Sequence, residues 1–254
     1  MYKPKYLLYF LICISDSLFA QKIPLSEWGV VPSEDLTLTH CMQDSTATAY
    51  VLQDAGMIKL VLTERGPEVI FNRHKRVKIF DPVAFDQGNL RIYYRSNRSE
   101  EKFEDLEVQT IAPDGTKKKV KSDNVFTETI TDQFNAKKVF IPNLQKGTII
   151  EYRYKLRSSD YFTLYDWYFQ EDIPVRWSQV EVSLPEYSRY TTFSREPRPY
   201  DLLETRKEKP EFFSNAQYNR NVTTYGYKHM PALKDDEPFV RNANDYRTRI
   251  WFQR

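Results

Sequence analysis

Residues 146–185 decide the fold of this chain. The stretch begins Lys146-Gly-Thr-Ile-Ile-Glu-Tyr-Arg-Tyr-Lys-Leu156, continues through Trp167-Tyr-Phe-Gln-Glu-Asp-Ile-Pro-Val-Arg-Trp-Ser178, and finishes Gln179-Val-Glu-Val-Ser-Leu-Pro185. Apolar and polar residues alternate in its first and last parts, which is typical of strands with one buried and one solvated face. The side chains predicted to point inward are Ile150, Tyr152, Tyr154, Leu156, Val180, Val182 and Leu184, and those predicted to point outward are Glu151, Arg153, Lys155, Gln179, Glu181 and Ser183.

The same alternation recurs along the rest of the chain between turn signals. The expected turns contain the scarce glycines, at Asp54-Ala-Gly56, Arg65-Gly-Pro67, Asp86-Gln-Gly88 and Pro113-Asp-Gly115. Short strands separated by such turns predict an all-β fold, an antiparallel β-sandwich with little helix. Residues 186–237 are expected to be less regular but packed on the sandwich, because they carry too many aromatic residues for a solvated linker. One or two turns of helix are expected over Tyr200–Arg206.

The N-terminus has the pattern of a secretory signal peptide. Lys3 and Lys5 precede an apolar run over residues 6–14, and the small residue Ala20 follows. We predict cleavage after Ala20, a mature chain of residues 21–254, and export to the periplasm or the cell surface. The apolar run is short for a membrane anchor, which is the alternative. Cleavage removes Cys13 and leaves Cys41 as the single cysteine, so the mature chain can form no internal disulfide.

Five motifs, in order, resemble one family. They are His74-Lys-Arg-Val-Lys-Ile-Phe-Asp81, Gly147-Thr-Ile-Ile-Glu-Tyr-Arg-Tyr154, Trp167-Tyr-Phe-Gln170, Ile173-Pro174 with Ser178, and Pro231-Ala-Leu-Lys-Asp-Asp-Glu-Pro238. From about Ala47 to the C-terminus the chain is similar to the exported bacterial domain of unknown function 3857. The resemblance implies a β-sandwich that usually precedes a transglutaminase-like core, a papain-like fold with a Cys-His-Asp triad. It carries no catalytic residue over to this sequence.

The end of the chain agrees with that expectation. Residues 246–254 alternate apolar and polar side chains up to Arg254, as in a strand, whereas chains usually finish in a polar, frayed tail. The sequence therefore predicts that a transglutaminase-like core would begin after Arg254, in cis, and that this chain does not contain it.

The sequence offers few candidates for chemistry. The weak ligand-site candidates are Tyr165, Trp167, Glu171 and Asp172, because aromatic rings beside carboxylates suit a carbohydrate. The alternative is that these aromatic residues fill the core and that the two acids form a polar corner. His40 precedes Cys41, but adjacent residues on a strand point to opposite faces, so we expect an inert thiol. His74 lies in a basic run, read as a solvated strand face, with an anion contact as the alternative.

Catalytic, metal and cofactor sites are therefore all predicted to be absent, and the chain alone is predicted not to be an enzyme. The formal net charge of +2 argues against nucleic acid as a partner. The predicted function is a non-catalytic exported module that positions or binds substrate for a transglutaminase-like domain. The alternative is a free-standing glycan- or peptide-binding β-sandwich of the cell envelope, whose partner would be an envelope protein, a peptide or a glycan.

Overall fold

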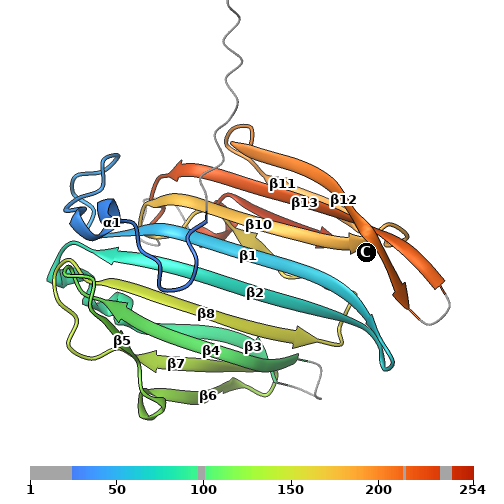
Figure 1. Cartoon of the computed structure of the whole chain (residues 1–254), viewed down its shortest axis with the longest axis horizontal. Coiled ribbons are helices and arrows are strands. Elements are labelled where there is room, and N and C mark those ends of the chain that lie inside the picture. Colours follow the sequence, from blue (N-terminus) through green and yellow to red (C-terminus); the bar gives the residue numbers. More distant parts are fainter. Residues whose placement is uncertain (1–24, 97–100, 214–215, 235–241) are drawn as a thin grey trace, which may run out of the picture.

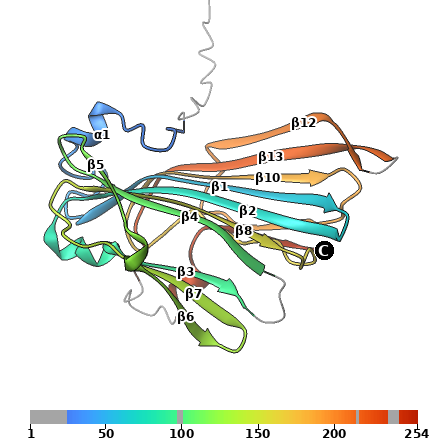
Figure 2. The same cartoon turned by 60° about the horizontal axis from the view of Figure 1, so that its bottom comes forward.

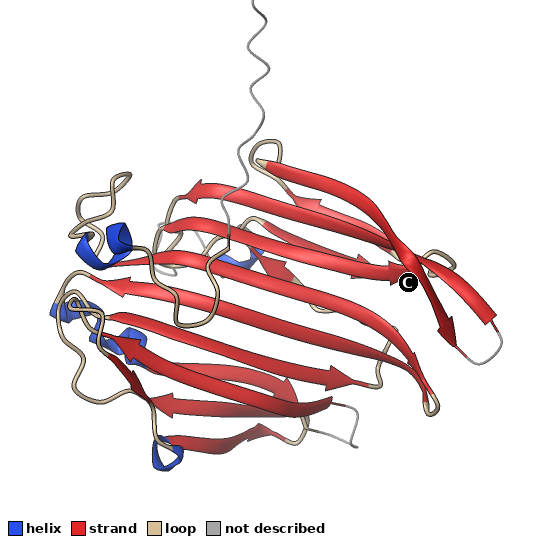
Figure 3. Ribbon diagram, viewed as in Figure 1, coloured by secondary structure: helices blue, strands red, loops and turns tan. Residues whose placement is uncertain are grey.

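A computed structural model describes residues 25–96, 101–213, 216–234 and 242–254; the predicted signal peptide lies outside the described residues. Strands dominate (Figures 1 and 3), and the one α-helix described, α1 (Ser33–Thr37), has five residues. The strands are β1 (Ala49–Thr63), β2 (Gly66–Ile79), β3 (Asn89–Arg95), β4 (Glu101–Ile111), β5 (Lys117–Lys119), β6 (Val125–Thr131), β7 (Phe134–Phe140), β8 (Ile149–Ser158), β9 (Trp167–Tyr168), β10 (Val175–Pro185), β11 (Thr191–Arg195), β12 (Leu202–Phe213), β13 (Ala216–Met230) and β14 (Arg249–Gln253). In the described part of the chain, three short 3-10 helices lie in the connections: η1 (Pro82–Gly88), η3 (Ser122–Asn124) and η4 (Ala243–Asp245).

The predicted all-β sandwich is confirmed, but its sheets differ from the expected antiparallel pair. One sheet has eight strands in the order β12-β13-β10-β1-β2-β8-β4-β5, and two smaller sheets have the orders β11-β14-β9 and β3-β7-β6. Among the described strands, all pairings are antiparallel except that of β1 with β10, which is parallel. This one pairing departs from the antiparallel arrangement of the rest, because β1 and β10 are distant in sequence and no local turn constrains their relative direction.

The two smaller sheets cover one face of the large sheet, here called the inner face: Figure 2 shows β3, β7 and β6 on that side, and Trp167 of β9 and Ile250 of β14 share a core with Ile58 of β1. The main core lies between them and contains Val51, Ile58 and Leu60 of β1, Val139 of β7 and Ile250 of β14. The N-terminal segment, residues 25–48, crosses the opposite face, here called the outer face (Figure 2). A second, smaller core cluster packs against that segment and includes Cys41, Tyr50, Leu52, Phe80, Ile111 and Ile149.

The alternation predicted for residues 146–185 is confirmed on the inner face. Ile150, Tyr152, Tyr154, Leu156, Val180 and Val182 are all buried there, and Leu184 is half-buried. The outer face is less exposed to solvent than predicted, because the side chains of Glu151, Gln179 and Ser183 are also buried. Gly29 of the N-terminal segment contacts Glu151, and the Trp177 indole donates to Gln179 at 2.8 Å. The contact of Gly29 has no signature in the local sequence.

Gly56 does not form the turn predicted at Asp54-Ala-Gly56. The three residues lie inside β1, which runs without a break from Ala49 to Thr63. A Cβ atom at position 56 would lie 2.3 Å from the indole ring of Trp167, which packs across the strand. The glycine is therefore required for a close approach rather than for chain reversal.

The segment 186–237 is more regular than expected. Within it, β12 and β13 form a long antiparallel pair at the edge of the large sheet, and β11 joins a smaller sheet. The helix expected over Tyr200–Arg206 is wrong, since Leu202 already begins β12. The predicted terminal strand is present as β14, where Ile250 and Phe252 are buried. No helix among the described residues is long and apolar enough to cross a membrane.

Candidate functional site

A groove crosses the outer face of the large sheet beside the N-terminal segment. Its volume is about 600 Å³, and its lining comes from β10, β1, β2, β8 and β4 with Leu25 at the rim. The strand registers place its side chains in two rows that run across the strands. The first row is Gln179, Ala55, His74, Arg153 and Glu107, and the second is Glu181, Met57, Asn72, Lys155 and Asp105.

Both rows end in an acid on β4, whereas on β10 the first row ends in the amide of Gln179 and the second in the carboxylate of Glu181. Ala55, Met57 and Asn72 lie in the middle, whereas Glu181 and the Glu107–Arg153 pair lie toward the two sides. Four strand spacings separate β10 from β4, so a row spans roughly 19 Å at about 4.8 Å per spacing. The groove can therefore accommodate an elongated ligand with an apolar middle and polar ends.

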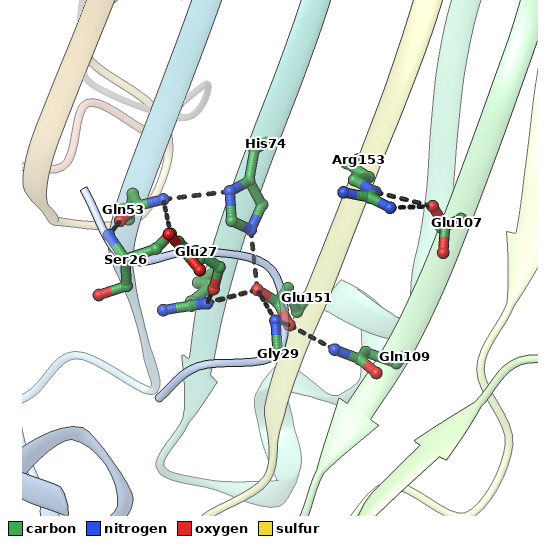
Figure 4. Close-up of polar contacts among 10 residues, drawn as sticks. Ser26, Glu27, Gly29, Gln53, His74, Glu107, Gln109, Glu151 and Arg153 are labelled. Carbon is green, nitrogen blue, oxygen red and sulfur yellow. Dashed lines mark hydrogen bonds and ion pairs between the residues drawn. The ribbon is translucent and has the colours of Figure 1, made fainter. Parts of the chain in front are cut away.

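Beneath one wall of the groove lies a buried polar network around Glu151 (Figure 4). This carboxylate is fully buried and receives hydrogen bonds from His74 Nε2 at 2.8 Å, Arg76 Nε at 2.7 Å and the Gly29 amide at 3.0 Å. Gln109 also donates to it, at 2.5 Å. Burial alone would raise the pKa of Glu151, but the hydrogen bonds from His74 and Gln109 and the charge of Arg76 outweigh it and lower the pKa to about 2.

The network also fixes the tautomer of His74. The Ser26 amide donates to Gln53 Oε1 at 2.8 Å, so the Gln53 amino group faces His74 Nδ1, 3.3 Å away, and donates to it. Nδ1 is then an acceptor, and the ring proton lies on Nε2, toward the carboxylate of Glu151. Both ring nitrogens of His74 are thereby engaged, and the imidazole is held as a fixed part of the groove wall.

The N-terminal segment is fastened across the sheet by the same residues. The Trp28 ring packs 5.7 Å from the His74 ring, and the Arg153 guanidinium stacks over Trp28 at 4.9 Å. Gly29, which follows, has a φ of 73° and points its amide at Glu151. This left-handed conformation favours glycine and brings the backbone close to the carboxylate. The wall of the groove is therefore ordered before any ligand binds.

The candidates predicted from the sequence lie elsewhere, mostly on the inner face. Trp167 is buried, and its Nε1 donates to Ser178 Oγ at 3.1 Å. Tyr165 stacks on Phe71 with ring centroids 4.5 Å apart and donates to Glu101. Asp172 is exposed.

Glu171 belongs to an ion cluster with Asp54, Arg73 and Lys75. Arg73 bridges the two acids, at 2.8 Å from Asp54 Oδ1 and 3.1 Å from Glu171 Oε1, and stacks over Trp167 at 5.0 Å. Burial raises the pKa of Glu171, but the charges of Lys75 and Arg73 outweigh it and lower the pKa to about 2. The structure thus joins Trp167 to Glu171 through Arg73, in the interior of the sandwich. A ligand role for the four candidates predicted from the sequence, Tyr165, Trp167, Glu171 and Asp172, stays a prediction.

The remaining sequence candidates have structural partners. Cys41 is a free thiol in the second core cluster, and its Sγ donates to Gln43 Oε1 at 3.3 Å. His40 contacts Thr39 Oγ1 through Nδ1 at 3.1 Å. Among the described residues, no group of three or more His, Cys, Asp or Glu side chains could hold a metal ion.

Sequence reasoning missed the groove and its network. One signal was available: Arg76 and Glu151 carry opposite charges at outward positions of two strands, and they pair in register. The contact of Glu151 with Gly29, however, joins residues 122 positions apart, and no local pattern indicates it.

Comparison with known proteins identifies a family and a solved structure of similar fold. The model of a family described as a domain of unknown function with solved structure (DUF3857) matches residues 68–234. No curated protein matches the chain. Among solved structures, that of a "putative protease" from Parabacteroides distasonis ATCC 8503 is similar, with a TM-score of 0.61 and 16% identity. The match covers 81% of this chain and 40% of that protein, so this chain spans less than half of its length.

Proposed function

Because the chain belongs to the DUF3857 family, we propose that it is a non-catalytic exported module that binds an extended peptide for a protease-like domain of the transglutaminase type. The observation that carries the proposal is the pair of five-residue rows across the outer face. They form a groove whose wall the Glu151 network orders in advance. Pre-ordering a wall lowers the entropic cost of binding, which suits a recognition surface.

Binding is a better reading of the groove than catalysis. Among the described side chains that line it, none carries an aliphatic hydroxyl or a thiol. His74, the one lining imidazole, has both nitrogens engaged by Gln53 and Glu151. A nucleophile, a base and an orienting group are the set that group transfer requires, and the lining does not assemble it.

A peptide fits the groove better than a glycan does. A strand-like peptide rises about 3.3 Å per residue, so five or six residues match the roughly 19 Å row. Met57 and Leu25 offer apolar contact, while the amide of Asn72 and the carboxylate of Asp105 offer polar contact. Trp28, which packs on His74 and Arg153 of the lining, is half-buried and presents little free ring face to a sugar.

The test measures binding and turnover separately on the purified mature chain. Hydrolysis and transamidation assays against peptides and peptidoglycan-derived stem peptides are expected to match buffer. Titration calorimetry with the same peptides is expected to show saturable binding. Met57→Arg fills the groove with a charged chain and is expected to weaken binding at least about tenfold, since it removes an apolar contact and buries a charge.

The matched control is Thr191→Arg, at an exposed position of β11 on another sheet; it is expected to change the affinity less than about twofold. Equal weakening by both substitutions would place binding outside the groove. A turnover that survives purification and disappears on changing Glu171 or Asp172 would contradict the proposal and favour an enzyme acting on glycans.

A further inference from the structure

Strand β6 is an open sheet edge that carries no basic residue and no proline, and its one register irregularity lies at its end. The three sheets end in β12, β5, β11, β9, β3 and β6. Natural edges are blunted by lysines, prolines, bulges or shortness, because an unpaired row of N–H and C=O groups invites another strand. In β12 a register shift lies beside Lys209 and Pro210, β5 is three lysines, and β9 has two residues. β6 reads Val125-Phe-Thr-Glu-Thr-Ile-Thr131, with no basic residue and no proline.

The pairing geometry of β6 leaves a flat segment at its start. Its one register irregularity lies between Thr129 and Thr131, beside the hairpin to β7. Residues 125–129 pair regularly with β7 on one side, and no strand of the described chain pairs with the other side. Five residues of regular edge are sufficient for an added strand to form a short ladder.

The face of this small sheet that points away from the core is apolar and exposed. Phe126 is 56% exposed, Phe140 52%, Tyr93 53% and Phe134 40%. A hollow of about 610 Å³ lies between Phe126 and Phe140, with Arg91 and Lys138 in its lining. Exposed apolar patches of this kind on a soluble protein mark interaction sites.

One acid determines the charge that a partner strand would need. Glu128 Oε1 lies 3.1 Å from Lys138 Nζ, while Glu128 Oε2 is buried and has no hydrogen-bond partner among the described residues. Opposite charges on neighbouring strands of one face stabilise pairing, and like charges oppose it. Two β6 strands paired about their centres would place two Glu128 side chains together, which disfavours a second copy of this chain.

We propose that β6 accepts an extended segment of a partner protein by strand addition. The segment carries a basic residue beside Glu128 and an apolar residue two positions away, next to Phe126. Backbone hydrogen bonds to the free edge supply affinity, and the alternating side chains supply specificity. This surface is separate from the groove on the large sheet and does not depend on the function proposed for it.

The probe is a fluorescent peptide, acetyl-Thr-Ile-Thr-Lys-Thr-Ile-Thr-amide, titrated with the mature chain and followed by anisotropy. Saturable binding is expected. N-methylation of alternate amides, which removes donors but keeps the side chains, is expected to weaken it at least about tenfold. Glu128→Lys is expected to weaken binding of this peptide about fivefold and to strengthen binding of the peptide with Glu in place of Lys.

Two controls keep the result interpretable. Lys118→Glu reverses a charge on another edge, β5, and is expected to leave both affinities unchanged within about twofold. Glu128→Gln removes the charge without adding repulsion toward Lys138, so it is expected to give an intermediate loss even if Glu128→Lys unfolds. The proposal is overturned by an absence of saturable binding, by equal binding of the N-methylated peptide, or by a dimer in sedimentation analysis that dissociates as the peptide binds.

Discussion

His74 and Glu151 meet diagonally across β2 and β8. In register, His74 lies opposite Arg153 and Glu151 lies opposite Arg76, yet His74 Nε2 is 2.8 Å from Glu151 Oε1. The carboxylate is fully buried and the imidazole is one-fifth exposed, so the pair connects the interior to the wall of the groove. Glu151 also binds the Gly29 amide, and the same acid therefore holds the N-terminal segment and orients the histidine.

Glu151→Gln should destabilise the fold strongly. Arg76 is 1% exposed, and removing its partner would leave a buried charge uncompensated, at a cost of about 3–5 kcal/mol. Glu107→Gln is the matched control, because its partner Arg153 is half exposed and such pairs contribute about 0–1 kcal/mol. Urea unfolding measures both free energies. Equal losses in the two variants would mean that the buried network contributes no more than a surface pair.

Acid should remove the contribution of Glu151 between pH 4.5 and pH 2. Its pKa falls from an ordinary 4.5 to about 2 on folding, so the folded state holds the proton less tightly than the unfolded state does. The stabilisation, about 3 kcal/mol, is present above pH 4.5 and is lost as the pH falls toward 2. Thermal midpoints of the parent chain and Glu151→Gln should therefore converge at pH 2. Glu171 and Glu211 also have lowered pKa values, but they titrate in both proteins and leave the difference unaffected.

Gly56→Ala should clash with Trp167. The added Cβ would lie 2.3 Å from the six-membered part of the indole, and overpacking of this kind costs about 1–3 kcal/mol. Trp167→Phe removes that part of the ring, so the double variant should lose less stability than the sum of the single variants. Urea unfolding of the four proteins in this cycle measures the coupling. Strictly additive losses of unfolding free energy would show that a Cβ at position 56 and the ring of Trp167 do not clash.

Cys41 should behave as an inert thiol. It is 1% exposed, so a thiol reagent should react with it slowly in the native mature protein and should titrate one thiol in denaturant. Cys41→Ser keeps a donor toward Gln43 and should cost about 1 kcal/mol. Peptide binding in the groove should be unchanged. Loss of binding at full stability would restore a functional role for the thiol.

Processing of the N-terminus is a separate prediction. The signal pattern places cleavage after Ala20, so intact mass analysis of the exported protein should find Gln21 as its first residue. A chain that retains residues 1–20 after export would indicate an anchor instead.

The sequence by itself determined the features that depend on neighbouring residues. Alternation in β8 and β10 predicted which side chains face the core, because successive residues of a strand point to opposite faces whatever lies beyond. The turn at Pro113-Asp-Gly115 was equally local: the Gly115 amide bonds to the Ala112 carbonyl at 2.9 Å, and Gly115 has a φ of 84°. The family followed from short motifs of the same kind.

Only the tertiary structure decided which segments meet. The parallel pairing of β1 with β10 joins Val51 to Val175, and Glu151 is buried because Gly29 crosses over it. Gly56 resembled a turn residue until Trp167 was seen to pack on it. These contacts join segments more than 100 residues apart, and their energies come from complementary surfaces that exist only once the sheets have formed. The groove joins five strands and borders the N-terminal segment, and its β1–β10 and Gly29–Glu151 contacts are of this long-range kind, so residue patterns along the chain could not reveal it.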